Sequence, residues 1–227
     1  MLFDLKGKRR RAVQVTYLGL AILIGLGLIG FGVGSSVNGG LSDIFSGGGG
    51  GSNTANKTLQ KDIDAANRQL AVNPRDTAAL RTLILRHYQL AGSTENPQTN
   101  TFTSAGKQEL QKASAAWDRY VALVPKPDPA LATAMVQAYD TTALNIPAKA
   151  TKAAEIVAAA QPSVQAYERI IGYATLAHDT RTADLATSKA LDLTPAGERA
   201  TVKKQIAQLK AQATAMAGQA GAPSRAP

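Results

Sequence analysis

The residues that could carry chemistry in this chain are few. Its 227 residues include two histidines, His87 and His178, and no cysteine. Thiolate catalysis and cysteine-based metal sites are therefore excluded, and neither histidine has a carboxylate at the spacing of a metal-binding pair. The apolar residues around His87 predict a half-buried packing role. His178 precedes Asp179 at an expected turn and suits a helix C-terminus, where a positive charge is favourable.

Other catalytic patterns are missing too. Asp62 and Asp64 are two residues apart, so on a helix they do not face one site, and we expect them to be solvated. The glycines at 47–51 are typical of a linker rather than of a phosphate loop, and no serine nucleophile elbow occurs. We therefore expect no enzyme activity, no cofactor and no metal. The single tryptophan, Trp117, is expected in the core, with a ligand contact as the second interpretation.

The elements that would position a site are predicted to be helices. Alanine is abundant, apolar residues recur at spacings of three and four, and no stretch alternates with a period of two. The first apolar stripe consists of Leu59, Ile63, Ala66 and Leu70. Further helices are expected at residues 77–91, 104–123, 128–143, 148–160, 164–177, 181–193 and 196–217. The fold class that follows is all-α.

The prolines that close these helices are regularly spaced. Pro125, Pro162 and Pro195 are 37 and 33 residues apart, close to the period of about 34 residues in tetratricopeptide repeats. Residues 164–195 resemble one such repeat unit. Its first helix would pack through Tyr167, Ile170, Ile171 and Ala174, and its second through Ala183, Thr187 and Ala190.

Two earlier units follow the same pattern. The preceding unit would pack through Leu131, Ala134, Met135, Ala138, Ala150, Ala154 and Val157, and the unit before it through Ala113, Trp117 and Tyr120. A polar insertion at 92–103 separates the helices of that earlier unit, and residues 196–217 would form a terminal capping helix. The alternative is an irregular helical bundle.

The tetratricopeptide resemblance implies a right-handed superhelix whose first helices line a groove. The groove positions that it implies are Arg81, Thr82, Leu85, Tyr88, Thr133, Val136, Tyr139, Asp140, Glu168, Arg169 and Thr175. A surface of mixed polar and aromatic residues suits extended polypeptide segments. The alternative is that these residues are merely exposed.

The N-terminal part of the chain predicts a membrane anchor. Five basic residues precede residue 12, whereas residues 12–34 carry no charge and the next basic residue is Lys57. A helix of roughly 22 residues spans about 33 Å, enough to cross a bilayer core of about 30 Å. The charge asymmetry places the N-terminus in the cytoplasm. A cleaved signal peptide is the rival interpretation.

The expected organisation is therefore a tethered domain outside the membrane. It comprises a basic cytoplasmic tail at 1–11, a transmembrane helix at 12–34, a Gly/Ser-rich linker at 35–55, a repeat domain at 56–217 and a disordered tail at 218–227. The pairs Ala21/Gly25 and Gly30/Gly34 would let another membrane helix approach closely, although glycine is common in membrane helices in any case.

This layout is similar to that of YfgM-type ancillary subunits of the bacterial Sec translocon. The resemblance implies a protein of the bacterial cytoplasmic membrane, with one span and its repeat domain outside, that binds other polypeptides as an adaptor or chaperone. The alternative is a structural scaffold in an envelope complex without client peptides. Residues 53–227 carry 20 basic and 14 acidic residues without a long basic run. We therefore expect protein partners and no nucleic acid.

Overall fold

The computed structural model describes residues 52–96, 99 and 101–220. These residues form eight α-helices, one short 3-10 helix and one small hairpin. The elements are α3 (Ser52–Val72), α4 (Thr77–Gly92), β1 (Glu95–Asn96), β2 (Thr101–Phe102), α5 (Ser104–Leu123), α6 (Pro129–Ala138), α7 (Pro147–Ala160), α8 (Val164–Leu176), α9 (Thr180–Asp192), η1 (Ala196–Glu198) and α10 (Arg199–Ala220). The expected all-α class is confirmed for this part of the chain.

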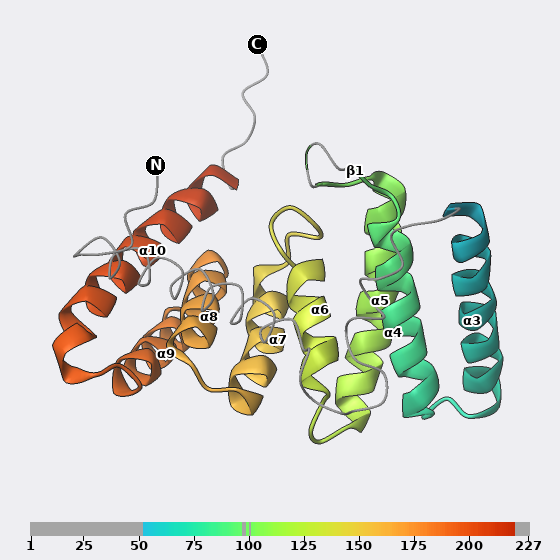
Figure 1. Ribbon diagram of the computed structural model, residues 1–227, viewed down its shortest axis with the longest axis horizontal. Coiled ribbons are helices and arrows are strands. Elements are labelled where there is room, and N and C mark those ends of the chain that lie inside the picture. Colours follow the sequence, from blue (N-terminus) through green and yellow to red (C-terminus); the bar gives the residue numbers. More distant parts are fainter. Residues whose placement is uncertain (1–51, 97–98, 100, 221–227) are drawn as a thin grey trace, which may run out of the picture. The chain divides into compact units, whose positions relative to one another are not determined.

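The helices follow one another as antiparallel neighbours (Figure 1). Three helix pairs form, α4 with α5, α6 with α7, and α8 with α9. Helix α3 packs against α4, and α7 packs against α8, whereas α6 makes a smaller contact with α4 and α5. Successive pairs are therefore in contact. The last helix differs, because α10 lies mainly against α8 and touches α9 only slightly. Each pair thus covers an apolar face that its neighbour leaves open.

Local sequence signals explain where these helices begin. Five of them start behind a side chain that accepts a hydrogen bond from a free backbone amide of the first turn. These caps are Asp76, Thr103, Asp128, Ser163 and Asp179. Proline stands at the first position of α6 and of α7, where its missing amide costs nothing.

The core is built largely from alanine and branched aliphatic residues. The expected packing positions that are buried include Ile63, Ala66, Leu70, Ala113, Trp117, Tyr120, Leu131, Met135, Ala150, Ala154, Ile170, Ile171, Ala174, Ala183 and Ala190. Leu59, Val157, Tyr167 and Thr187 are only half-buried. Small side chains let the helices approach closely, and the few large ones fill the remaining space.

Helix α6 is shorter than the pattern predicts. It ends at Ala138 rather than near residue 143, and a turn follows it. The backbone of Asn145 has a φ of 53°, a left-handed conformation that asparagine tolerates better than most residues. The Asn145 amide donates to the Asp140 carbonyl over 2.8 Å. This closed turn replaces the last turn of the expected helix.

Other boundaries also differ from the prediction. Helix α3 starts at Ser52, inside the segment expected to be linker, and α10 continues to Ala220, inside the expected tail. The insertion at 92–103 contains a two-residue antiparallel hairpin in which Glu95 pairs with Phe102. Period-2 alternation is no guide to a strand pair this short.

None of the helices in the described part of the chain is long and apolar enough to cross a membrane. The predicted span at 12–34, with Ala21, Gly25, Gly30 and Gly34, lies outside the described residues, as does the predicted tail at 1–11. The handedness expected of the superhelix stays a prediction.

Gly106, in the first turn of α5, is expected to be intolerant of a side chain. A Cβ there would collide with Thr94 Oγ1 and lie 3.2 Å from the Ala91 carbonyl oxygen. Gly106→Ala should therefore displace the hairpin and lower the free energy of unfolding by about 1–3 kcal/mol. Chemical denaturation followed by circular dichroism measures this loss.

Gly172 in α8 provides the matched control. Its Cβ would lie 3.7 Å from Leu209 Cδ1, an ordinary contact. Gly172→Ala should raise stability by up to about 1 kcal/mol, because alanine favours a helix interior. Equal effects of the two substitutions would contradict the close approach at Gly106.

Candidate functional site

The groove residues expected on α4 lie along one face of that helix. Arg81, Leu85 and Tyr88 are spaced by four and three residues, so they share a side. Arg81 lies against α6, with its Nη2 2.7 Å from Asp128 Oδ2, and its Nη1 donates to Tyr120 Oη over 3.4 Å. Leu85 is half-buried and packs against the core. The charged end of this face is therefore already paired within the protein.

Two tyrosine hydroxyls connect the first helices of the three pairs. Tyr88 on α4 donates to Gln137 Oε1 on α6. Tyr173 on α8 donates to Asp140 Oδ2 over 2.8 Å, just beyond the end of α6. Burial raises the pKa of Tyr88 to about 12 and also raises that of Tyr173, so both hydroxyls stay protonated donors. Both tyrosines therefore reach towards α6, one from α4 and one from α8.

We call this area the first-helix surface. It consists of Arg81, Leu85, Tyr88, Gln137, Asp140, Arg169 and Tyr173. Gln137 and Arg169 are exposed, and the others are half-buried. Neither Gln137 nor Tyr173 was predicted from the sequence. The signal that could have found Tyr173 is its place four residues after Arg169, one turn further along the face of a predicted groove residue.

Val136 and Tyr139 do not belong to this surface, and their prediction as groove residues is wrong. They are only 3% and 1% exposed. Tyr139 keeps a helical backbone at the C-cap of α6 and lies one turn after the buried Met135, so its side chain faces inward. Its hydroxyl lies 2.9 Å from Ser114 Oγ on α5. Burial raises the pKa of Tyr139 to about 12. Tyr139 joins helix pairs instead of meeting a ligand.

The cluster around Tyr139 contains a serine and a lysine, a combination that some enzymes use for nucleophilic attack. Lys149 Nζ donates to Ser114 Oγ over 3.1 Å and to Asp118 Oδ2 over 2.6 Å, and it lies 5.7 Å from the centre of the Tyr139 ring. Lys149 thus bridges the Ser114 hydroxyl and the Asp118 carboxylate. Ser114 is 6% exposed, so a substrate has no access to it.

The threonines expected in the groove are occupied by their own helices. Thr82, Thr133 and Thr175 donate to the backbone carbonyl four residues earlier, over distances of 2.7 to 3.1 Å. Glu168 is half-buried, whereas Arg169 is exposed on α8. Among the predicted groove residues, Arg81 and Asp140 are bonded within the protein, whereas the exposed Arg169 can meet a partner.

His87 is buried, as predicted, but it also has an acidic partner that the sequence did not reveal. Its Nδ1 lies 2.6 Å from Glu109 Oε2, and Lys112 lies 2.7 Å from the other carboxylate oxygen. Burial lowers the pKa of His87 although Glu109 opposes that effect. Burial alone would raise the pKa of Glu109, but hydrogen bonds from Lys112 and His87 hold it below its usual range. A neutral imidazole donating to a carboxylate therefore fixes α4 against α5.

The other candidates have structural roles. His178 lies at the end of α8, as expected, with a φ of 57°, and its amide donates to the Thr175 carbonyl. Asp62 is partly exposed, as expected, and it also forms an ion pair with Arg86, whose Nε lies 2.8 Å away. Trp117 is buried, as predicted. The described residues contain no group of three or more side chains able to hold a metal ion.

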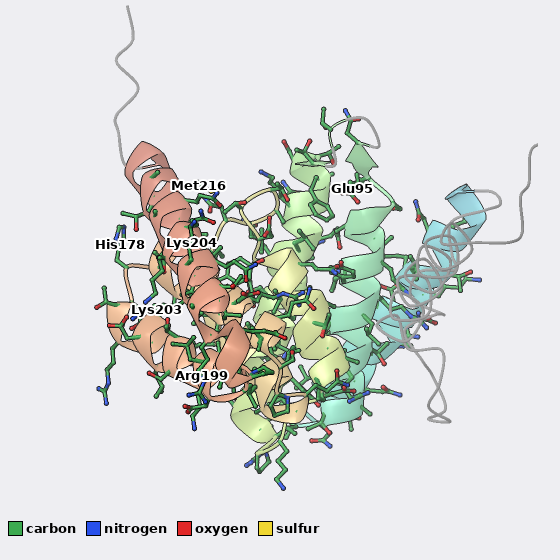
Figure 2. All side chains as sticks on the ribbon, turned by 60° about the vertical axis from the view of Figure 1, so that its left-hand side comes forward. Glu95, His178, Arg199, Lys203, Lys204 and Met216 are labelled. Carbon is green, nitrogen blue, oxygen red and sulfur yellow. The ribbon has the colours of Figure 1, made fainter. Side chains whose placement is uncertain are left out.

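Two hollows border α10. One of about 300 Å³ is lined by Leu191, Asp192, Arg199, Ala200 and Lys203. The other, of about 380 Å³, is lined by Thr141, Asn145, Pro147, Leu176, His178, Met216 and Ala217. Figure 2 shows Arg199, Lys203 and Lys204 on the first turns of α10 and Met216 towards its other end. The sequence did not predict either hollow, because both depend on the direction in which α10 crosses α8.

Comparisons of the chain with protein-family models, with curated proteins and with solved structures found no match.

Proposed function

We propose that this protein is a membrane-tethered adaptor whose helical domain lies outside the cytoplasmic membrane and binds extended segments of other polypeptides. The observation that carries the proposal is the first-helix surface. It crosses three helix pairs without interruption and combines aromatic rings with amide and charged groups. Tyr88 and Tyr173 offer rigid rings, while Gln137 and Arg169 offer exposed hydrogen-bonding groups. Such a surface matches the spaced side chains of an extended chain.

The tether and the stacked units support the same proposal. The uncharged segment at 12–34 behind a basic cluster suits a membrane anchor with the domain outside. The three stacked pairs suit a repeat protein of the tetratricopeptide type, and the layout suits a role beside the Sec translocon. The second candidate function is a scaffold in an envelope complex. It is favoured by the tyrosine hydroxyls, which are already bonded within the protein.

Site-specific photocrosslinking in living cells tests the proposal. A photoreactive residue placed at Gln137 or at Arg169 of the full chain should form adducts with exported polypeptides and translocon subunits. The same residue at Lys152, which is exposed on the second helix α7, is the matched control and should form few. Mass spectrometry identifies the adducts.

The outcomes separate the two functions. Adducts with a fixed set of envelope enzymes would favour the scaffold. Equal labelling from Gln137 and Lys152 would remove the first-helix surface as the site. Arg169→Ala should reduce crosslinking from Gln137 several-fold without unfolding the domain, because Arg169 is exposed and its loss leaves no buried group unpaired.

A further inference from the structure

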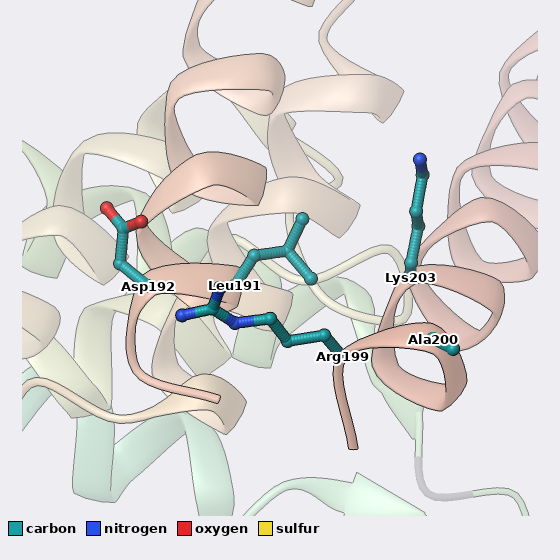
Figure 3. A pocket seen from close by; sticks show the side chains of 5 residues that line it. All are labelled: Leu191, Asp192, Arg199, Ala200 and Lys203. Carbon is teal, nitrogen blue, oxygen red and sulfur yellow. The ribbon is translucent and has the colours of Figure 1, made fainter. Parts of the chain in front are cut away.

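The hollow between α9 and α10 combines an apolar wall with cations. Leu191 and Ala200 supply apolar surface, Arg199 and Lys203 supply positive charge, and Asp192 is its one carboxylate. Figure 3 shows the Arg199 side chain extending towards Leu191 and Asp192, while the Lys203 side chain stands on the other side. The volume of about 300 Å³ is open to solvent and large enough for a few side chains of a partner.

Helix α10, which borders this hollow, is positively charged. Helix α10 carries four basic residues and no acidic one. Lys210 is paired with Asp184 over 2.7 Å, and Arg199 Nε donates to the Thr194 carbonyl over 3.2 Å. Lys203 and Lys204 are exposed and form no ion pair with any residue that the structure describes.

We infer that this hollow, the α9–α10 hollow, binds an acidic segment of a polypeptide. Carboxylates of the segment would lie between Arg199 and Lys203, where charge-assisted hydrogen bonds form. A neighbouring apolar side chain would contact Leu191. A recess with an apolar wall fits a side chain, whereas a flat bilayer would contact the protruding Lys204 and leave Leu191 uncovered. This site is separate from the first-helix surface and does not depend on it.

The probe is a fluorescein-labelled peptide, Gly-Glu-Leu-Glu-Glu-Leu-Glu-Gly, titrated with the full-length protein in a mild non-ionic detergent. Fluorescence anisotropy should show binding that weakens as the salt concentration rises, because exposed charges are screened. A peptide with lysine in place of glutamate should not bind. Arg199→Gln combined with Lys203→Gln should weaken binding about tenfold or more.

Matched variants make the test specific. Lys57→Gln combined with Lys61→Gln removes the same charge from exposed positions on α3 and should leave the affinity nearly unchanged. Asp192→Asn should strengthen binding two- to threefold, because it removes the opposing carboxylate. Arg199→Lys keeps the positive charge and should therefore bind the acidic peptide more tightly than Arg199→Gln does. Circular dichroism verifies that each variant is folded.

The remaining outcomes overturn the inference. Absence of binding by the acidic peptide would do so, as would equal losses in the α3 and α10 variants. Binding by short-chain phosphatidylglycerol with none by the peptide would assign the cations of α10 to a lipid surface instead. Failure of the photocrosslinking at Gln137 would leave this inference untouched, since the two experiments probe different residues.

Discussion

Replacing Trp117 with alanine should lower the free energy of unfolding by about 3–5 kcal/mol, because it removes a large buried side chain and leaves a cavity. Trp117 is 4% exposed, and its ring centre lies 5.7 Å from that of Tyr120. The substitution should also weaken the contacts of Tyr120, because its ring loses its neighbour. The Tyr120 hydroxyl accepts hydrogen bonds from Arg81 and from the Asp128 amide, which join α4 and α6 to α5. Urea denaturation of the full-length protein, followed by far-ultraviolet circular dichroism, measures the change.

Two controls bracket this result. Val72→Ala alters a side chain that is 88% exposed and should change stability by less than about 0.5 kcal/mol. Trp117→Phe keeps an aromatic ring and should cost less than the alanine substitution. A Trp117→Ala protein as stable as the Val72→Ala protein would show that the tryptophan is at the surface, where a ligand could reach it.

Replacing Asp140 with alanine should cost about 1.5–3 kcal/mol, the range for hydrogen bonds to a charged group. Its carboxylate accepts from the Tyr173 hydroxyl over 2.8 Å, from the Thr142 amide over 3.1 Å and from the Thr141 hydroxyl over 3.2 Å. Asp140→Ala removes the acceptor for these donors and for the Thr142 hydroxyl, which donates over 3.1 Å, and so loosens the turn after α6. The midpoint of urea denaturation at neutral pH measures the loss.

The same carboxylate gives a pH dependence with a definite sign. Burial alone would raise the pKa of Asp140, but the hydrogen bonds from Thr142, Tyr173 and Thr141 outweigh it, so the folded pKa lies below the usual value. Its contribution is therefore fully present above the unfolded pKa of about 4 and is lost as the pH falls through the folded pKa. Asp140→Asn should flatten the decline in stability over that acidic range. An unchanged decline would show that other carboxylates, such as Glu109, cause it.

The sequence predicted the helices well because their signals are local. Prolines, capping side chains and apolar stripes each act within one or two turns, so the ends of α5 and α7 were within one residue of the prediction. The end of α6 was not, because its stop depends on the left-handed Asn145 and on bonds to Asp140. Those interactions form only once the turn closes.

The site was harder to predict, for reasons of packing. Six of the ten residues of α6 are buried, so its polar face is narrow and only Thr133 and Gln137 mark the side that meets the solvent. Val136 and Tyr139 were therefore assigned to the wrong side. Trp117 was assigned correctly, because a large aromatic side chain in an alanine-rich helix has few places other than the core. The α9–α10 hollow depends on a crossing direction that no local pattern encodes.

The tyrosine bridges have a consequence for register. Alanine-rich faces are smooth, so two such helices could slide past each other by one turn at little cost in buried area. The hydrogen bonds of Tyr88 and Tyr173 reach one acceptor each, and a shift of one turn, about 5.4 Å, would break them. The hydroxyls thus select one alignment among several of similar compactness. Phenylalanine in place of Tyr88 and Tyr173 would keep the helices packed, but it would let them adopt more than one alignment along their axes.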